Sequence, residues 1–170
     1  MYPDPDSQNK QLPDTLNEKV DLLLRREIEA RLLAYMITAL SAEFGREKVI
    51  AIVKETIIAI AREQGITLAQ SMRGCGSVEF LESLKSWQKD DALQMDILEQ
   101  SDEHLDFNVT CCRYAEMYQA LGIPELGTVL SCNRDFALIK GFNPKANLER
   151  SQTIMEGAPY CDFRFRFPKD

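Results

Sequence analysis

The chain has 170 residues, and 45% of them are hydrophobic, which excludes the composition of a disordered protein and suffices for one domain with a core. A formal net charge of −7 argues against binding to nucleic acid phosphates or to anionic membranes. No apolar run approaches the roughly 20 residues of a transmembrane helix, so we expect a soluble protein.

The start of the chain differs from the rest. Residues 1–13 are polar and acidic and lack the basic and apolar regions of a secretory signal, so we expect a disordered lead-in. Residues 14–170 are then expected to form a single domain. The chain has five cysteines, an odd number, and without an export signal we expect reduced thiols, no disulfide framework and a cytoplasmic location.

A helical period dominates the N-terminal half. Thr15 and Glu18 have the spacing of a capping box, and behind them apolar residues recur every three or four positions. This pattern predicts a long amphipathic helix over Thr15–Leu40, whose apolar face carries Val20, Leu24, Ile28, Leu32, Tyr35 and Ala39. We expect this face to lie in the core or to form the contact of a homodimer.

A second helix, rich in isoleucine and largely buried, is predicted from Arg46 to Gln64. Gly65 is expected to end it, because glycine accepts the positive φ common at a helix C-terminus. The sequence also predicts a short helix at Thr67–Arg73. A further helix is expected to begin at Ser77, with inward-facing Phe80, Leu81, Leu84 and Trp87.

Apolar residues alternate in much of the C-terminal half, which is typical of strands with one buried face. In chain order we predict strands over Leu93–Ile97 and Leu105–Val109, helices over Arg113–Leu121, Pro124–Ser131 and Asp135–Lys140, and strands over Leu148–Glu156 and Cys161–Phe167. The expected fold class is α+β, with N-terminal α-helices packed with a C-terminal, mainly antiparallel four-stranded sheet that carries two short inserted helices.

Three stretches of the C-terminal half resemble a known family. They are Asn108–Tyr118, Leu130–Pro144 and Gln152–Phe165. In this order they look like the blocks of the L-2-amino-thiazoline-4-carboxylic acid hydrolase family, and the resemblance covers Leu93–Phe167. It implies a cofactor-independent hydrolase acting on a cyclic amidine-type C–N bond of a small carboxylate substrate. The namesake substrate of the family is a thiazoline carboxylate, which is opened to N-carbamoyl-cysteine.

Such a hydrolysis needs a nucleophile and a group that transfers protons. Cys161 and Cys132 are the candidate thiols, although each is also the kind of small side chain that protein cores bury. Glu156 and Asp135 are the candidate acid and base. Their structural alternatives are a hydrogen bond to the Gly157 turn for Glu156 and a helix cap for Asp135.

A substrate carboxylate needs a cation to hold it. The candidates are Arg113, at a strand-to-helix junction, and Arg164, with Tyr114 and Asn133 as further hydrogen-bonding groups. Arg164 alternates with phenylalanines in the last strand, and this pattern more often indicates a solvated sheet face with cross-strand ion pairs.

The alternative hypothesis is a non-catalytic small-molecule binding or sensor domain, with an apolar pocket walled by Phe163, Phe165 and Phe167. We expect no metal and no other cofactor, because the adjacent pair Cys111-Cys112 lacks the CxxC spacing of zinc ligands. The expected partners are a small molecule and a second copy of the chain, and neither nucleic acid nor a membrane.

Overall fold

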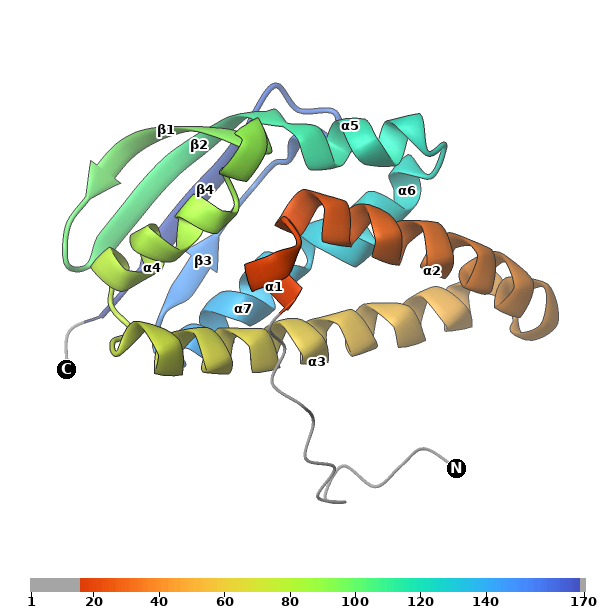
Figure 1. Cartoon of the computed structure of the whole chain (residues 1–170), viewed down its shortest axis with the longest axis horizontal. Coiled ribbons are helices and arrows are strands. Elements are labelled where there is room, and N and C mark those ends of the chain that lie inside the picture. The colour runs from red at the N-terminus through yellow and green to blue at the C-terminus, as the bar shows by residue number, and fades with distance from the viewer. Residues whose placement is uncertain (1–15, 169–170) are drawn as a thin grey trace, which may run out of the picture.

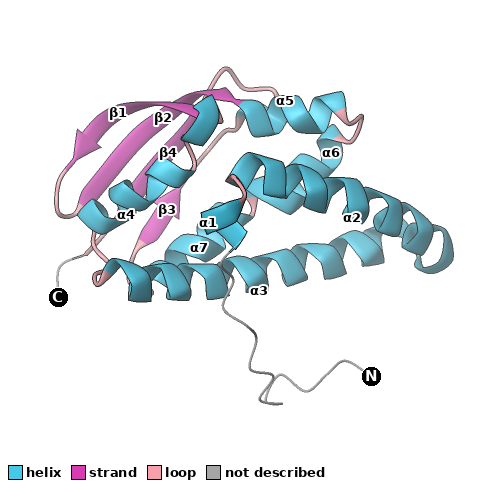
Figure 2. Ribbon diagram, in the orientation of Figure 1, coloured by secondary structure: helices cyan, strands magenta, loops and turns pink. Residues whose placement is uncertain are grey.

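The computed structural model describes residues 16–168. The predicted α+β class is confirmed, since a helical half packs against an antiparallel sheet (Figures 1 and 2). None of the described helices is long and apolar enough to cross a membrane. The elements are α1 (Leu16–Lys19), α2 (Leu22–Phe44), α3 (Arg46–Met72), α4 (Ser77–Ser83), η1 (Leu84–Ser86), η2 (Lys89–Asp91), β1 (Leu93–Gln100), β2 (His104–Cys112), α5 (Arg113–Ala120), α6 (Pro124–Gly127), η3 (Thr128–Cys132), α7 (Arg134–Phe142), β3 (Asn147–Glu149), η4 (Ile154–Glu156) and β4 (Cys161–Arg166).

Helices α2 and α3 form a long hairpin beside the sheet (Figure 1). Asp21 caps α2, because its side chain accepts a hydrogen bond from the Leu24 N–H at 2.8 Å. The hairpin turns at Gly45, whose φ of 84° favours glycine. The capping box predicted at Thr15 and Glu18 lies outside the described side chains.

The predicted end of the second helix at Gly65 is wrong, because α3 continues to Met72. Gly65 is buried where α3 crosses α7, and a Cβ there would lie 2.1 Å from the Leu138 carbonyl oxygen. On the other helix, a Cβ at Gly141 would lie 2.0 Å from the Arg62 carbonyl oxygen. The two glycines therefore serve a close approach of two backbones and not a helix end.

The predicted apolar face of α2 does not enter the core. Leu24, Ile28, Leu32 and Tyr35 are exposed, and the residues of α2 that are buried are Arg26, Ala30 and Ile37. The core of the helical half forms instead between the hairpin and the segments α5, α6 and η3. The sequence predicted that this face lies either in the core or in a homodimer contact. Its exposure in the fold rules out the core.

In the described part of the chain, the sheet has four strands in the order β1-β2-β4-β3, all antiparallel. Phe107 on β2 lies opposite Phe163 on β4, and their rings stack with centroids 4.9 Å apart. The alternation predicted for the last strand is confirmed, because Cys161, Phe163, Phe165 and Phe167 are buried. Helices α4 and α7 cover this inner face, and their Phe80 and Phe142 pack in the same core cluster.

The strand predicted over Leu148–Glu156 is much shorter than expected. Of this segment, only the three residues of β3 pair with β4, and the chain then leaves the sheet. Asp162 accepts hydrogen bonds from the backbone N–H groups of Ser151 and Gln152, which holds this segment away from a ladder. The chain next forms the 3₁₀ turn η4, where the Thr153 side chain accepts a hydrogen bond from the Glu156 N–H.

The helix predicted over Pro124–Ser131 is interrupted. Its first turn, α6, begins with Pro124 as expected, but η3 is a π turn, in which the Asn133 N–H bonds to the Thr128 carbonyl. Helix α7 then begins at Arg134, one residue before the predicted start, and ends at Phe142. The π turn carries Cys132, which lines a cavity together with Arg134 and Asp135 from the start of α7.

Candidate functional site

A cavity of about 100 Å³ lies where the helical half meets the inner face of the sheet. Its apolar wall includes Trp87, Leu93, Val109, Leu138 and Phe163. Its polar lining comes from α2, α3, β2, α5, η3, α7, β4 and the loop after β3, and comprises Arg26, Gln64, Cys112, Tyr114, Ser131, Cys132, Arg134, Asp135, Arg150 and Cys161. Segments far apart in the sequence therefore meet around one small space.

Asp135 and Arg150 form an ion pair in the cavity wall. Arg150 Nη1 lies 2.5 Å from Asp135 Oδ2, and Arg150 Nη2 donates to the Cys132 carbonyl at 3.1 Å. The guanidinium is also held between aromatic rings, 5.0 Å from the centroids of both Phe136 and Phe163. Burial raises the pKa of Asp135, although the charge of Arg150 acts in the opposite direction.

Three thiols line the cavity, but their surroundings do not favour thiolates. Burial raises the pKa of Cys112 to about 11, and it also raises the pKa of Cys132 and of Cys161. The Cys161 sulfur accepts a hydrogen bond from the Ile154 N–H at 3.2 Å. At neutral pH all three side chains are therefore thiols, which are weak nucleophiles.

A group of guanidinium side chains surrounds Glu29 beside the cavity. Arg25 Nε, Arg26 Nη1 and Arg134 Nη2 lie 3.0, 2.6 and 3.4 Å from its carboxylate oxygens. Arg134 also donates to the Leu130 carbonyl at 3.0 Å. Burial, reinforced by the charge of Arg26, lowers the pKa of Arg134 to about 10, so Arg134 still carries its charge at pH 7.

Tyr114 is buried in the cavity wall, and its hydroxyl has no hydrogen-bond partner among the described residues. Burial raises the pKa of this hydroxyl, so it is a neutral donor. Its neighbour on α5, Tyr118, differs, because its hydroxyl is 3.1 Å from Ser131 Oγ. Of the predicted site residues, Tyr114 thus joins Cys132, Asp135 and Cys161 at the cavity.

The four other predicted site residues do not line the cavity. Glu156 is exposed, and the Thr153 hydroxyl donates to its carboxylate at 2.6 Å, which is a turn-capping role. Arg113 is exposed and donates to the Asp90 carbonyl at 2.9 Å. Asn133 is half-buried at the N-cap of α7, where its side chain makes no capping hydrogen bond.

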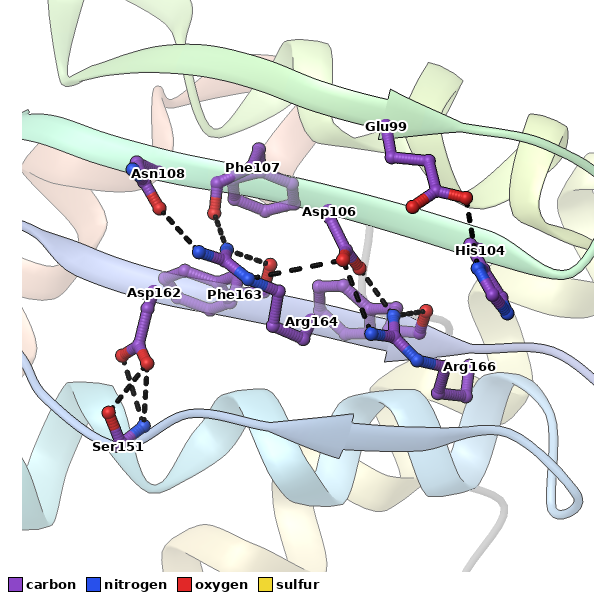
Figure 3. A network of polar contacts seen from close by, with 11 residues as sticks. Glu99, His104, Asp106, Phe107, Asn108, Ser151, Asp162, Phe163, Arg164 and Arg166 are labelled. Atoms are coloured by element: carbon purple, nitrogen blue, oxygen red, sulfur yellow. Dashed lines mark hydrogen bonds and ion pairs between the residues drawn. The ribbon is translucent and has the colours of Figure 1, made fainter.

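Arg164 lies on the opposite face of the sheet from the cavity (Figure 3). Its guanidinium donates at 2.9 Å to both the Phe107 carbonyl and Asn108 Oδ1. Next to it, Asp106 pairs with Arg166 across β2 and β4. This network is the cross-strand arrangement that the alternation pattern also indicated, and it stabilises the outer face of the sheet.

Among the described residues, no group of three or more histidine, cysteine, aspartate or glutamate side chains could hold a metal ion. The three cavity thiols and Asp135 thus share a cavity without forming a ligand set.

Comparison with known families identifies the chain. Residues 25–165 match the family model described as L-2-amino-thiazoline-4-carboxylic acid hydrolase. The chain belongs to this family. The match includes every polar residue that lines the cavity, from Arg26 to Cys161. No curated protein matches the chain.

Two solved structures show how this member of the thiazoline-carboxylate hydrolase family compares in fold. One is a trafficking protein particle complex subunit 3 from Naegleria fowleri, covalently bound to palmitic acid, with 11% identity, a TM-score of 0.53, and coverage of 86% of this chain and 96% of that chain. The other is the phenol-responsive sensory domain of the transcription activator PoxR with phenol, with 13% identity, a TM-score of 0.51, and coverage of 79% and 72%. At these identities the likeness concerns the fold alone.

Proposed function

We propose that this protein hydrolyses a small cyclic amidine-type substrate that carries a carboxylate, and that the reaction takes place in the cavity. Family membership supports a hydrolase. The observation that carries the proposal is that Cys132, Asp135 and Cys161, from two separate stretches of the sequence, line one cavity with the Asp135–Arg150 ion pair in its wall.

The size of the cavity suits a small ring. An apolar cavity of about 150 Å³ accommodates one benzene molecule, so about 100 Å³ is of the right order for a five-membered ring. Larger ligands need more space, since pockets for drug-sized molecules measure about 300–1,000 Å³. The lining combines apolar side chains with charged ones, as a ring with a carboxylate requires.

The protonated thiols favour water as the nucleophile, with Asp135 as the group that transfers protons. The water oxygen bonds to the carbon between nitrogen and sulfur, and Asp135 accepts one water proton. The ring nitrogen ends with the other proton. In a thiazoline the ring carbon–sulfur bond then breaks, the sulfur takes the proton from Asp135, and the product is an N-carbamoyl thiol. If nitrogen replaces sulfur in the ring, the bond that breaks is C–N.

Burial suits Asp135 to this role, because a carboxylate with a raised pKa is a stronger base. Arg150 fixes its orientation through the 2.5 Å contact. Cys132 and Cys161 would shape the pocket as neutral side chains.

Replacement of Asp135 tests the proposal. Asp135→Asn keeps the shape of the side chain but cannot accept the proton, so turnover of L-2-amino-thiazoline-4-carboxylate is expected to fall about a hundredfold or more. The matched control is Glu156→Gln, which removes an exposed carboxylate outside the cavity and should leave turnover unchanged. The released product is measured by mass spectrometry, and thermal melting establishes that both variants fold. Equal turnover in the two variants would remove Asp135 from the mechanism.

A non-catalytic binding or sensor role is the second candidate. The raised pKa values of the thiols and the apolar wall around Phe163 favour it, because both are expected of a pocket that holds a ligand without reacting. Native mass spectrometry of the purified protein tests this role. A retained small molecule, together with no ring opening by the wild-type protein, would support the sensor and reject the hydrolase.

We also infer a cytoplasmic location. All five cysteines are free, as expected in a reducing compartment.

A further inference from the structure

We infer that Arg26, Arg134 and the Tyr114 hydroxyl form the subsite that binds the carboxylate of the ligand. Nothing in the sequence pattern placed a substrate cation on α2, and the exposed Arg113 is not available to the cavity. The inference rests on the proposed function only in taking the ligand to be a small carboxylate, and binding can be measured without turnover.

An excess of positive charge beside the cavity is the first argument. Arg26 and Arg134 both line the cavity and are each 6% exposed, and within the described residues their only carboxylate partner is Glu29. Glu29 is also bonded to Arg25. One carboxylate is therefore shared by the two cavity guanidinium groups of Arg26 and Arg134, whereas the charges of Asp135 and Arg150 match one to one. A buried cation without a full counter-charge is unfavourable, and a bound anion would remove that cost.

The hydroxyl of Tyr114 is the second, independent argument. Tyr114 is 8% exposed, and its hydroxyl finds no acceptor among the described side chains and backbone. Buried polar groups almost always have a partner, so an unmatched donor in a cavity wall indicates a ligand atom that accepts its hydrogen bond. A carboxylate oxygen accepts both from a tyrosine hydroxyl and from a guanidinium, which explains why these groups occur together.

The alternative, a purely structural role for these residues, predicts different behaviour. If Arg26 and Arg134 only cross-link α2 to α7 through Glu29, the Tyr114 hydroxyl serves no purpose, and its loss would not affect ligands. Tyr114→Phe removes this hydroxyl alone. Because the hydroxyl has no partner among the residues that the structure describes, the melting temperature without ligand should stay the same or rise.

The test uses the chain's single tryptophan, Trp87, which lines the cavity and reports binding through its fluorescence. The probes are 2-aminothiazole-4-carboxylate, an aromatic ring that resists hydrolysis, and 2-aminothiazole, which lacks the carboxylate. We expect the wild-type protein to prefer the carboxylate probe. Tyr114→Phe and Arg26→Gln should each weaken its binding about tenfold or more and leave 2-aminothiazole unaffected. Arg113→Gln is the matched control, with both affinities unchanged.

Two outcomes would overturn the inference. One is a wild-type protein that binds the carboxylate probe no better than 2-aminothiazole. The other is a Tyr114→Phe variant, folded by its melting curve, whose preference for the carboxylate equals that of the wild type. If the protein binds the carboxylate probe selectively but opens no thiazoline ring, the hydrolase proposal is rejected and the carboxylate subsite is still supported.

Discussion

At the scale of single residues, the cavity combines predicted and unexpected side chains. Four of the cavity residues could be predicted from the sequence, because they lie in the stretches that resemble the family: Tyr114, Cys132, Asp135 and Cys161. The arginines of the site could not. Arg26 lies on a charged face of an amphipathic helix, a pattern that normally indicates solvent, and only the tertiary fold shows that it is buried near Tyr114 of α5 and Arg134 of α7.

Arg150 was missed for a related reason. It follows the short strand β3, within a stretch predicted to continue as a strand. Its partner Asp135 lies 15 positions earlier in the chain, and no local spacing links the two side chains.

The protonated thiols give a chemical prediction. Iodoacetamide reacts with thiolates, so at pH 8 it should alkylate the exposed Cys75 well before Cys112, Cys132 and Cys161. Peptide mass spectrometry of a time course measures the order. Denatured protein is the control, in which the five cysteines should react at similar rates. Fast modification of a cavity cysteine in the folded protein would show that a thiolate is present there.

The raised pKa values of the cavity thiols also make the stability of the fold depend on pH. The folded pKa of Cys112, about 11, lies above its ordinary value, so the folded state holds this proton more tightly than the unfolded state does. The resulting stabilisation is complete below about pH 9 and is lost as the pH rises through about 11. Chemical denaturation should therefore give a falling free energy of unfolding between these pH values, and Cys112→Ala should reduce that slope.

At the scale of elements, the sequence was most informative for β2 and β4. One face of each packs on α4 and α7, so the apolar alternation appears directly in the sequence. It was least informative where tertiary contacts override the local pattern. Asp162 holds residues 151 and 152 out of the sheet, and Gly65 continues a helix that its residue type was expected to end.

The crossing of α3 and α7 yields a stability prediction. Alanine has the higher helix propensity, so Gly65→Ala would stabilise an isolated helix by about 1 kcal/mol. In the protein its Cβ would meet the Leu138 carbonyl, and we expect the free energy of unfolding to fall by about 3 kcal/mol or more. The control is Gly74→Ala, where the atoms nearest to a Cβ belong to the flexible Glu79 side chain. Urea denaturation measures both; a Gly65→Ala variant as stable as the wild type would contradict the close approach.

At the scale of the whole molecule, helix α2 presents a row of apolar side chains to solvent. Leu24, Ile28, Leu32 and Tyr35 are exposed along one helix, with Tyr35 81% exposed. A long exposed apolar row indicates a contact with another protein. The homodimer expected from the sequence is the simplest form of this contact, because two copies of the row present the same apolar surface to each other.

Light scattering during size-exclusion chromatography tests this expectation. The wild-type protein should elute at twice the mass of one chain, and Leu32→Glu should elute as a monomer, because a charge would be buried in the apolar contact. The control is Gln70→Glu, which adds a negative charge at an exposed polar position of α3. A monomeric wild-type protein would exclude the dimer.

The π turn η3 has a consequence for related sequences of the same family. A π turn holds one residue more than an α turn, and removal of that residue would let the segment between α6 and α7 continue as ordinary helix. Each residue advances a helix by about 100°, so the deletion would rotate either Cys132 or Asp135 away from its present direction. A relative with a one-residue gap between positions 128 and 132 would therefore be expected to have lost this cavity chemistry even if every polar residue were retained.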